Sequence, residues 1–417
     1  MTAIEKQGAA AKLAAAKLMA CPAKIKNDAL LNIAKSLEEK KQQIIEANEL
    51  DLENAKQNAM PASLMDRLAL DSERISAIAK SVLEVVSQSD PIGQVDKLET
   101  RPNGLVIGRK TVPLGVVAII YEARPNVTVD AAVLCLKAGN AVILRGGKDA
   151  FHSNNILAKI MREAIKKAGL PEDSIALIQD TSRDSVNALL NLSDYIDVLI
   201  PRGGAGLISH VVANSKVPVI ETGVGNCHVY VENSADLPMA ANIIFNAKCR
   251  RVSVCNAAET LLVDKAVAEE FLPLAKELLD TRNTELRGCD ETVRILGGCV
   301  VPASDEDYYT EFLDFILAVK VVDGIDAAIS HIGKYGSGHS EAIVTSNYTA
   351  SRRFLDEVDA SAVYVNASTS FTDGGEFGLG AEIGISTQKM HARGPMGVNQ
   401  LTSTKFIIYG DGHVRLP

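Results

Sequence analysis

Hydrophobic residues recur at helical spacing through the first 90 residues of the chain. Ile25, Leu30, Ile33 and Leu37 form one such series, and a second runs through residues 75–85. Apolar positions three or four residues apart form one face of an amphipathic α-helix. The sequence therefore predicts a helical N-terminal region.

From residue 98 the pattern changes to short apolar runs that alternate with helical stretches. A possible hairpin, opened by the turn pair Asn103-Gly104, is formed by 105–108 and 110–113. The expected strands are 116–120, 141–144, 175–178, 196–200 and 217–220, with helices at 129–137, 154–168 and 184–190 among them. Strands that alternate with helices in this way form a parallel sheet covered by helices.

A second α/β block spans residues 229–368. Its expected strands are 229–231, 260–263, 319–322 and 342–344, and its expected helices are 236–246 and 265–280. The glycine-rich segment 370–399 is expected to be a functional loop, because ordering many glycines has an entropic cost. Residues 405–409 form a final strand that can pair outside its own domain. The predicted fold class is α/β.

Composition narrows the classes of function. The 417 residues are 47% hydrophobic, which is enough core for two or three domains, and the net charge of -9 argues against nucleic acid and anionic membranes as partners. No apolar run approaches the ~20 residues that span a bilayer, and the N-terminus has no signal-peptide core. The seven cysteines lack CxxC spacing, so we expect no metal site and free thiols in a reducing cytoplasm.

One thiol, Cys255, follows two guanidiniums at Arg250 and Arg251. Nearby cations favour the thiolate, which is the nucleophilic form of cysteine. A small buried hydrophobic residue is the alternative interpretation, and spacing alone leaves the choice open.

Two glycine-rich loops follow predicted strands, at Leu144-Arg-Gly-Gly-Lys148 and at Pro201-Arg-Gly-Gly-Ala-Gly206. Such loops and helix N-termini bind phosphate groups, and ligands of open α/β sheets lie at the carboxyl ends of the strands. A dinucleotide would fit, although the G-x-G-x-x-G fingerprint is absent and tight turns are the alternative. Cations after the strand at 141–144 favour NADP over NAD. The predicted cofactor-binding residues here are Arg145, Gly146, Gly147, Lys148, Pro201, Gly203 and Gly204.

The segment 328–343 contains His331, Lys334 and His339. The two histidines are eight residues apart, which does not suit a helical zinc pair, and no third ligand follows. Binding of an anionic substrate and a polar surface turn remain as interpretations. A third cluster, at 389–397, contains Arg393 and is expected to be an ordered binding loop.

Several stretches resemble the γ-glutamyl phosphate reductase family, also called glutamate-5-semialdehyde dehydrogenases, within the aldehyde dehydrogenase superfamily. They occur in one order along the chain: 112–127, 139–148, 199–206, 253–256, 331–343, 364–368, 371–375 and 391–397. Two positions depart from the family, which usually has Thr at Cys249 and Pro at Val252. A second thiol six residues before Cys255 raises the possibility of a disulfide.

The resemblance implies an aldehyde-dehydrogenase-like fold with three parts. A Rossmann-like cofactor domain would comprise 1–98, 119–228 and 369–399, and an α/β catalytic domain would comprise 229–368. A small oligomerisation element would comprise 99–118 and 400–417, so a homo-oligomer is expected.

The resemblance also implies a reaction, the NADPH-dependent reduction of L-glutamyl 5-phosphate to glutamate 5-semialdehyde with release of phosphate, in proline biosynthesis. Cys255 would form a thioester, its backbone N–H and Asn126 would stabilise the oxyanion, and Glu311 would hold the nicotinamide ribose. Glutamate 5-kinase is a possible partner. The residues expected to gather the substrate's phosphate and carboxylate are Arg124, His331, Lys334, His339 and Arg393.

Two other functions remain open on the sequence. One is a hydrolysing aldehyde dehydrogenase in which Glu221 would activate water to cleave the Cys255 thioester. The other is a cofactor-free acyltransferase or an anion-binding protein.

Overall fold

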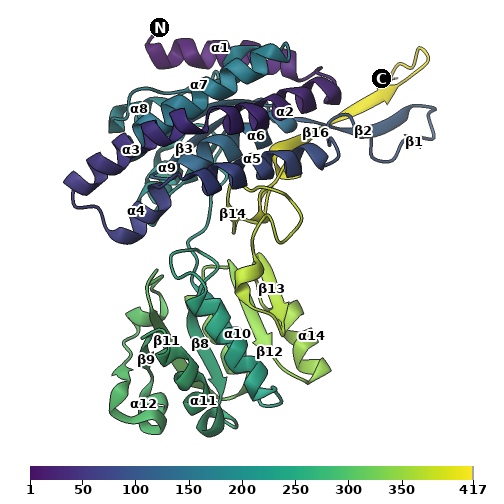
Figure 1. The fold of residues 1–417 in the computed structure, drawn as a ribbon. Coiled ribbons are helices and arrows are strands. Elements are labelled where there is room, and N and C mark those ends of the chain that lie inside the picture. The colour runs from purple at the N-terminus through teal and green to yellow at the C-terminus, as the bar shows by residue number, and fades with distance from the viewer. Residues whose placement is uncertain (416–417) are drawn as a thin grey trace. The chain divides into compact units, whose positions relative to one another are not determined.

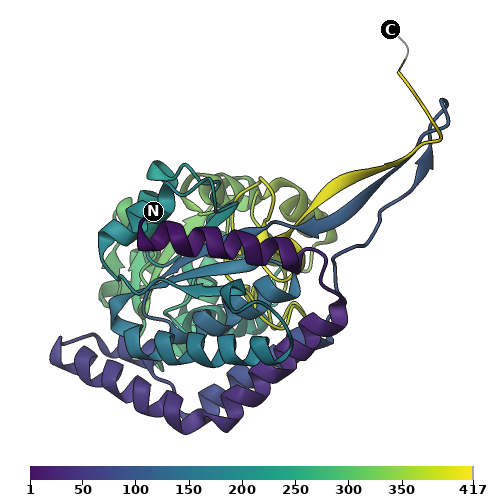
Figure 2. The ribbon, with the colours of Figure 1, turned by 90° about the horizontal axis from the view of Figure 1, so that it is seen from above.

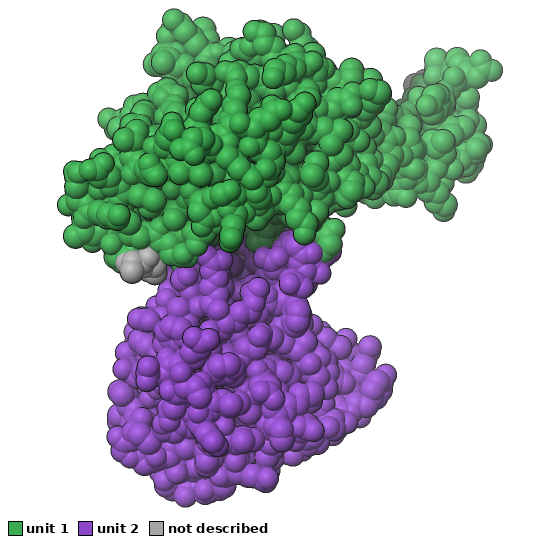
Figure 3. Space-filling view, viewed as in Figure 1, with its two compact units in different colours: residues 1–221, 378–384, 396–417 green, residues 222–377, 385–395 purple. Residues whose placement is uncertain are grey.

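The computed structural model describes residues 1–415, apart from the side chains of residues 62 and 63, and it forms two compact units (Figure 3). Unit 1 comprises residues 1–221, 378–384 and 396–417, and unit 2 comprises 222–377 and 385–395. The division follows residue 221, and the glycine-rich segment 370–399 is shared between the units. The functional labels given to the domains above stay predictions.

Unit 1 is built on a parallel sheet in the order β5-β4-β3-β6. Every residue of β3 and β4 is buried, as expected for parallel strands covered on both faces by helices (Figure 1). The strands are β3 (Val116–Tyr121), β4 (Ala141–Gly146), β5 (Ile175–Leu177) and β6 (Val198–Arg202), and the helices between and after them are α6 (Pro125–Lys137), α7 (Phe151–Lys167), α8 (Arg183–Leu190) and α9 (Ala205–Asn214). The predicted strand at 217–220 is reduced to one bridge between Leu199 and Val219, because Pro218 has no N–H to extend the ladder.

The N-terminal region is helical, as its spacing predicts. The helices are α1 (Ala3–Leu18), α2 (Ala23–Glu39), α3 (Lys41–Gln57), α4 (Ala62–Leu68) and α5 (Ser72–Ser87). Helix α2 packs against α5 and α7 (Figure 2). The side chains of its apolar face, Leu30, Ile33 and Leu37, are fully buried. Side-chain caps begin two of these helices: Thr2 accepts from the Glu5 N–H, and Asp71 accepts from the Arg74 N–H.

Three antiparallel strands extend from the rest of unit 1 in the order β1-β2-β16 (Figures 1 and 2). They are β1 (Glu99–Thr100), β2 (Val106–Pro113) and β16 (Thr402–Tyr409). The predicted hairpin between 105–108 and 110–113 is wrong, because residues 106–113 form one continuous strand, β2. The Asn103-Gly104 turn instead joins β1 to β2, with Gly104 at a positive φ of 90°.

Unit 2 is a parallel sheet in the order β10-β9-β11-β8-β7-β12-β13. The strands are β7 (Cys227–Val231), β8 (Ala258–Asp264), β9 (Glu285–Gly288), β10 (Val301–Pro302), β11 (Ile316–Val322), β12 (Ser340–Val344) and β13 (Ala362–Val365). The helices are α10 (Leu237–Cys249), α11 (Ala268–Asp280), α12 (Asp290–Leu296), α13 (Gly324–Tyr335) and α14 (Tyr348–Glu357). A short antiparallel pair joins β14 (Ile385–Ser386) to β15 (Gly394–Pro395).

Apolar side chains between the sheet and its helices form the core of unit 2. Ile244 of α10, Leu261 of β8 and Phe271 of α11 belong to one buried cluster there. Within residues 1–415, no helix is both long and apolar enough to cross a membrane.

Candidate active site

Cys255 lies in the loop between α10 and β8, just before the N-terminal end of β8, the central strand of the unit 2 sheet. Its thiol is half-buried, and its Sγ lies 3.2 Å from Nε2 of His339. His339 is fully buried and directly precedes β12. An imidazole at this distance can take the proton of a thiol, so the pair has the arrangement of an activated cysteine nucleophile.

The backbone of Gly225 packs directly against the Cys255 peptide. A Cβ atom at position 225 would lie 1.6 Å from the Cys255 carbonyl oxygen, so only glycine fits there. The Gly225 N–H donates to Oε1 of Glu311 at 2.9 Å. The next residue, Asn226, donates from Nδ2 to the carbonyls of Tyr308 (2.7 Å) and Tyr335 (2.8 Å). These bonds connect the Cys255 loop to the segments that carry Glu311 and His339.

Asn256 holds the other side of the Cys255 loop. Its Nδ2 donates to the Thr372 carbonyl at 3.0 Å, and its own carbonyl accepts from the Thr369 hydroxyl at 2.7 Å. The peptide that carries the thiol is therefore fixed before any ligand arrives, which reduces the reorganisation that a reaction at the sulfur requires.

A second thiol, Cys227, lies beside this pair. Its Sγ donates to the Cys255 carbonyl at 3.2 Å and lies 3.7 Å from Nδ1 of His339. Burial raises the pKa of the Cys227 thiol well above its ordinary value, so Cys227 stays protonated. Cys249, the neighbour in sequence, is buried in the helix-packed core and bonds to the Thr284 hydroxyl at 3.5 Å. All seven cysteines are free thiols, and Cys227 rather than Cys249 packs against Cys255.

Comparison with known proteins identifies the family to which this chain is similar. The aldehyde dehydrogenase family model matches residues 2–295. γ-Glutamyl phosphate reductases of Carboxydothermus hydrogenoformans and Halothermothrix orenii are 60% and 58% identical, covering 97% and 98% of this chain and the same shares of their own. The crystal structure of γ-glutamyl phosphate reductase from Thermotoga maritima matches 99% of both chains with a TM-score of 0.95 and 49% identity.

The chain belongs to the γ-glutamyl phosphate reductase family. This confirms the resemblance predicted from the sequence, and it confirms the aldehyde-dehydrogenase-like fold. As a member of the reductase family the protein is an oxidoreductase.

The predicted cofactor residues of the two glycine-rich loops lie at the carboxyl ends of neighbouring strands of unit 1. Gly146 of β4 and Arg202 of β6 both pair with Tyr121 of β3, so the loops that follow them lie side by side. At the start of α9, the Gly204 N–H donates to Oε2 of Glu122 at 3.0 Å. A carboxylate therefore occupies a position where a helix N-terminus attracts anions. Sequence reasoning did not single out Glu122.

Two of the predicted cofactor cations differ in their surroundings. Arg145 donates to the carbonyls of Thr181 (2.6 Å) and Ser182 (2.8 Å) and to the Ser185 hydroxyl, and burial lowers the pKa of its guanidinium. Its donors thus support the N-terminal turn of α8. Lys148 is exposed at the end of the same loop.

Of the residues predicted to stabilise the oxyanion and hold the cofactor, Asn126 and Pro201 are in unit 1, whereas Glu311 is in unit 2. Asn126 lies in the first turn of α6 and donates from Nδ2 to Asp130 at 3.1 Å. Arg124, the N-cap residue of α6, is half-buried in the same loop. Pro201 is buried within β6.

The remaining predicted substrate residues are dispersed over unit 2. His331 is buried on α13 against the rings of Tyr308 and Tyr335, at centroid distances of 5.1 and 4.3 Å. Burial lowers the pKa of His331 to about 3, so it is a neutral core residue and cannot attract an anion by charge. Lys334 donates to the Tyr335 hydroxyl at 2.6 Å, and Arg393 pairs with Asp359 at 2.7 Å.

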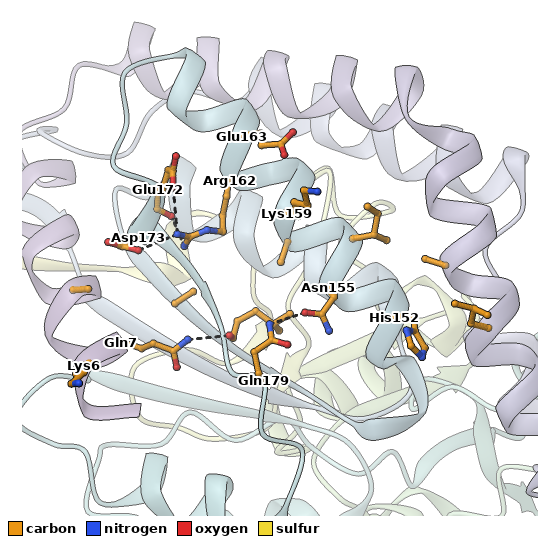
Figure 4. A pocket seen from close by; sticks show the side chains of 17 residues that line it. Lys6, Gln7, His152, Asn155, Lys159, Arg162, Glu163, Glu172, Asp173 and Gln179 are labelled. Carbon is orange, nitrogen blue, oxygen red and sulfur yellow. Dashed lines mark hydrogen bonds and ion pairs between the residues drawn. The ribbon is translucent and has the colours of Figure 1, made fainter. Parts of the chain in front are cut away.

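A groove in unit 1, between α1, α3, α7 and the edge strand β5, is lined by none of these residues (Figure 4). Its polar side chains serve the open edge of β5: Gln7 donates to the Leu177 carbonyl at 3.2 Å, and Arg162 donates to the Ile175 carbonyl. Arg162 also pairs with Asp173 at 3.1 Å. We interpret these groups as protection of the edge strand rather than as a binding site.

Proposed function

We propose that this protein reduces L-glutamyl 5-phosphate to glutamate 5-semialdehyde with NADPH and releases phosphate, as a step of proline biosynthesis. The observation that carries the proposal is the contact of 3.2 Å between Cys255 Sγ and His339 Nε2 in a chain 60% identical to a γ-glutamyl phosphate reductase. An acyl phosphate suits a thiolate, because phosphate is a good leaving group and needs no strong general acid.

In the proposed mechanism, the proton of Cys255 moves to Nε2 of His339 and the thiolate attacks the acyl carbon of the substrate. The backbone N–H of Cys255 and the side chain of Asn126 are the proposed oxyanion donors, each worth about 3–4 kcal/mol of the barrier. Departure of phosphate leaves a thioester on Cys255, and the fixed loop holds it in one place. Reduction of the thioester gives a thiohemiacetal. It breaks its carbon–sulfur bond to release the aldehyde and the Cys255 thiolate, whose charge protonated His339 balances.

NADPH supplies the hydride when it is bound, and the loops of unit 1 fit such a group. A Cβ atom at Gly146 would lie 2.2 Å from Asn154, and one at Gly203 would lie 2.7 Å from Glu122, so a side chain at either position would displace its neighbour. Glycines at these strand ends are what pyrophosphate-binding loops of α/β folds require. The carboxylate of Glu122 on the Gly204 N–H acts as a stand-in for an anionic oxygen. We propose Gly146, Gly147, Gly203 and Gly204 for the pyrophosphate, Lys148 for the 2′-phosphate and Glu311 for the ribose.

For the substrate, we propose that Arg124 and Arg393 bind the phosphate and the carboxylate, because guanidinium matches both groups in bidentate geometry. Lys334 is a further proposed substrate residue, and Asp305 and Tyr335 hold its ammonium in this structure.

The remaining proposals concern the oligomeric state of the enzyme, its location in the cell and a partner enzyme. Phe406, Ile408 and Tyr409 of β16 are 60–71% exposed, which supports a homo-oligomer that covers this strand. A Phe406→Glu change is expected to lower the mass measured by light scattering. We also retain a cytoplasmic location, which suits free thiols, and an encounter with glutamate 5-kinase, which would limit loss of a labile acyl phosphate.

Enzyme assays in the reverse direction test the proposal. Purified protein with NADP and glutamate semialdehyde is expected to sustain NADPH formation over many turnovers only when phosphate is present. Sustained turnover without phosphate, abolished by Glu221→Gln, would indicate a hydrolysing aldehyde dehydrogenase instead.

A further inference from the structure

A chain of hydroxyl groups begins at the far nitrogen of the histidine that contacts Cys255. Nδ1 of His339 lies 2.8 Å from Oγ of Ser340, which lies 2.6 Å from Oγ1 of Thr372. The same Thr372 oxygen lies 2.7 Å from the Tyr364 hydroxyl. The four side chains come from the start of β12, from β13 and from the segment after residue 371, so only the fold brings them together.

Because these groups are buried, the direction in which their hydrogen bonds donate decides where the histidine carries its proton. His339, Ser340 and Thr372 are fully buried, while Tyr364 is partly exposed. If the hydroxyls donate toward the histidine, Nδ1 accepts and Nε2 carries the proton, so Nε2 cannot take a proton from the thiol. If they donate away from it, Nδ1–H donates to Ser340 and Nε2 is free to accept. Each hydroxyl can donate and accept, so both directions satisfy every member.

We propose that Ser340, Thr372 and Tyr364 are positioning residues that hold a proton on Nδ1 of His339, so that Nε2 takes the proton of Cys255. The proton moves from Sγ to Nε2, and each hydroxyl keeps its own. The positive imidazole ring then has an acceptor at Nδ1, without which a buried charged donor would be left unpaired. This proposal rests on the proposed role of Cys255 as nucleophile, and it concerns how the thiolate forms.

No other titratable group described near Cys255 and His339 offers Nδ1 of His339 a comparable hydrogen-bond partner. Cys227 of β7 lies at 3.7 Å from Nδ1, too long for a strong bond, and burial keeps its thiol neutral. The carboxyls of Glu341 on β12 and Glu259 on β8 act on Cys227 and raise its pKa further. Glu311 accepts a hydrogen bond from the Gly225 N–H, and Gly225 packs against Cys255. Burial also raises the pKa of Tyr364, so the end of the chain stays a neutral phenol.

The rate of alkylation of Cys255 by iodoacetamide, followed across pH by mass spectrometry of its peptide, tests the proposal on the full chain. Thr372→Val removes the central hydroxyl at nearly constant shape, and it is expected to move the midpoint of the profile upward by about one pH unit, or about tenfold in rate below the midpoint. Tyr364→Phe is expected to cause a shift in the same direction, about threefold in rate. Thr372→Ser retains the hydroxyl and should restore the profile of the unchanged protein.

Tyr230→Phe is the matched control, because it also removes a buried hydroxyl of unit 2, one that donates to Asp264 rather than to the chain. Its profile should not move, and thermal unfolding of each variant checks that the fold is retained. Coinciding profiles of the unchanged protein, Thr372→Val and Tyr364→Phe would overturn the proposal. Alkylation needs neither NADPH nor substrate. A shifted profile in a protein without reductase activity would therefore support the positioning role of the three hydroxyl groups while refuting the proposed function.

Discussion

Nε2 of His339 lies 3.2 Å from Sγ of Cys255, although the two residues are 84 positions apart in the chain. The contact supports the proposed role of His339 as the base for the thiol. The sequence predicts that His339 binds an anionic substrate, and that assignment stays a prediction.

Replacing His339 with Gln is expected to lower kcat by about 10²–10⁴-fold, because the thiol loses the group that takes its proton. His331→Gln is a matched control from the same motif, since His331 packs against tyrosine rings. Steady-state kinetics of both variants check the assignment. Equal losses in the two would show that the motif acts through folding alone.

Gly225→Ala is expected to abolish most activity, because its methyl group would overlap the Cys255 carbonyl and displace the nucleophile. Gly333→Ala provides the control: a Cβ at this α13 position meets nothing within 4 Å, so near-normal kinetics are expected. The measurement is kcat/KM, with thermal unfolding alongside. An active Gly225→Ala enzyme would refute the tight packing at the site.

Glu122→Gln is expected to tighten NADPH binding by about fivefold, because the carboxylate competes with a phosphate for the Gly204 N–H at the N-terminus of α9. Glu49→Gln removes an exposed carboxylate from α3 and should leave the affinity unchanged. Fluorescence titration with NADPH measures both. Weaker binding in Glu122→Gln would instead show that the cofactor uses this carboxylate.

His331 should make the protein less stable in acid. Its pKa of about 3 in the folded state lies below the unfolded value of about 6.5, so between these pH values the unfolded chain binds a proton that the folded chain does not. The contribution is absent above pH 6.5 and grows more unfavourable as pH falls toward 3. Going from pH 7 to pH 5 should cost at most about 2 kcal/mol of unfolding free energy that His331→Gln does not lose. Denaturant unfolding at the two pH values measures the difference, and equal losses in both proteins would contradict it.

The alternation of apolar runs and helical stretches was sufficient to predict most of the sheet. Residues 116–120 and 141–144 were correctly predicted as strands, because buried parallel strands are apolar throughout. The same rule failed at 217–220, where Pro218 interrupts an apolar run. Turn pairs predicted the strands less well: the sequence identified the Asn103-Gly104 turn but not the two strands, β1 and β2, that it joins.

The candidate active site could be predicted from the sequence only in part. Cys255 could be selected through its motif, whereas His331 and His339 look alike in one short segment. Their difference arises from packing: one faces tyrosine rings on α13, and the other meets a sulfur from a distant loop. Cys227 and Glu122 carry no local signal, because their contacts with Cys255 and Gly204 span 28 and 82 residues.

A rapid-mixing experiment without phosphate tests the central claim, that Cys255 forms a thioester which phosphate discharges. With NADP and glutamate semialdehyde, the enzyme should produce a burst of about one NADPH per chain and then stop, with a glutamyl group on Cys255 in the acid-quenched protein. Added phosphate should restart turnover, and Cys255→Ala should show no burst. Continued turnover without phosphate, or a burst in Cys255→Ala, would contradict the account.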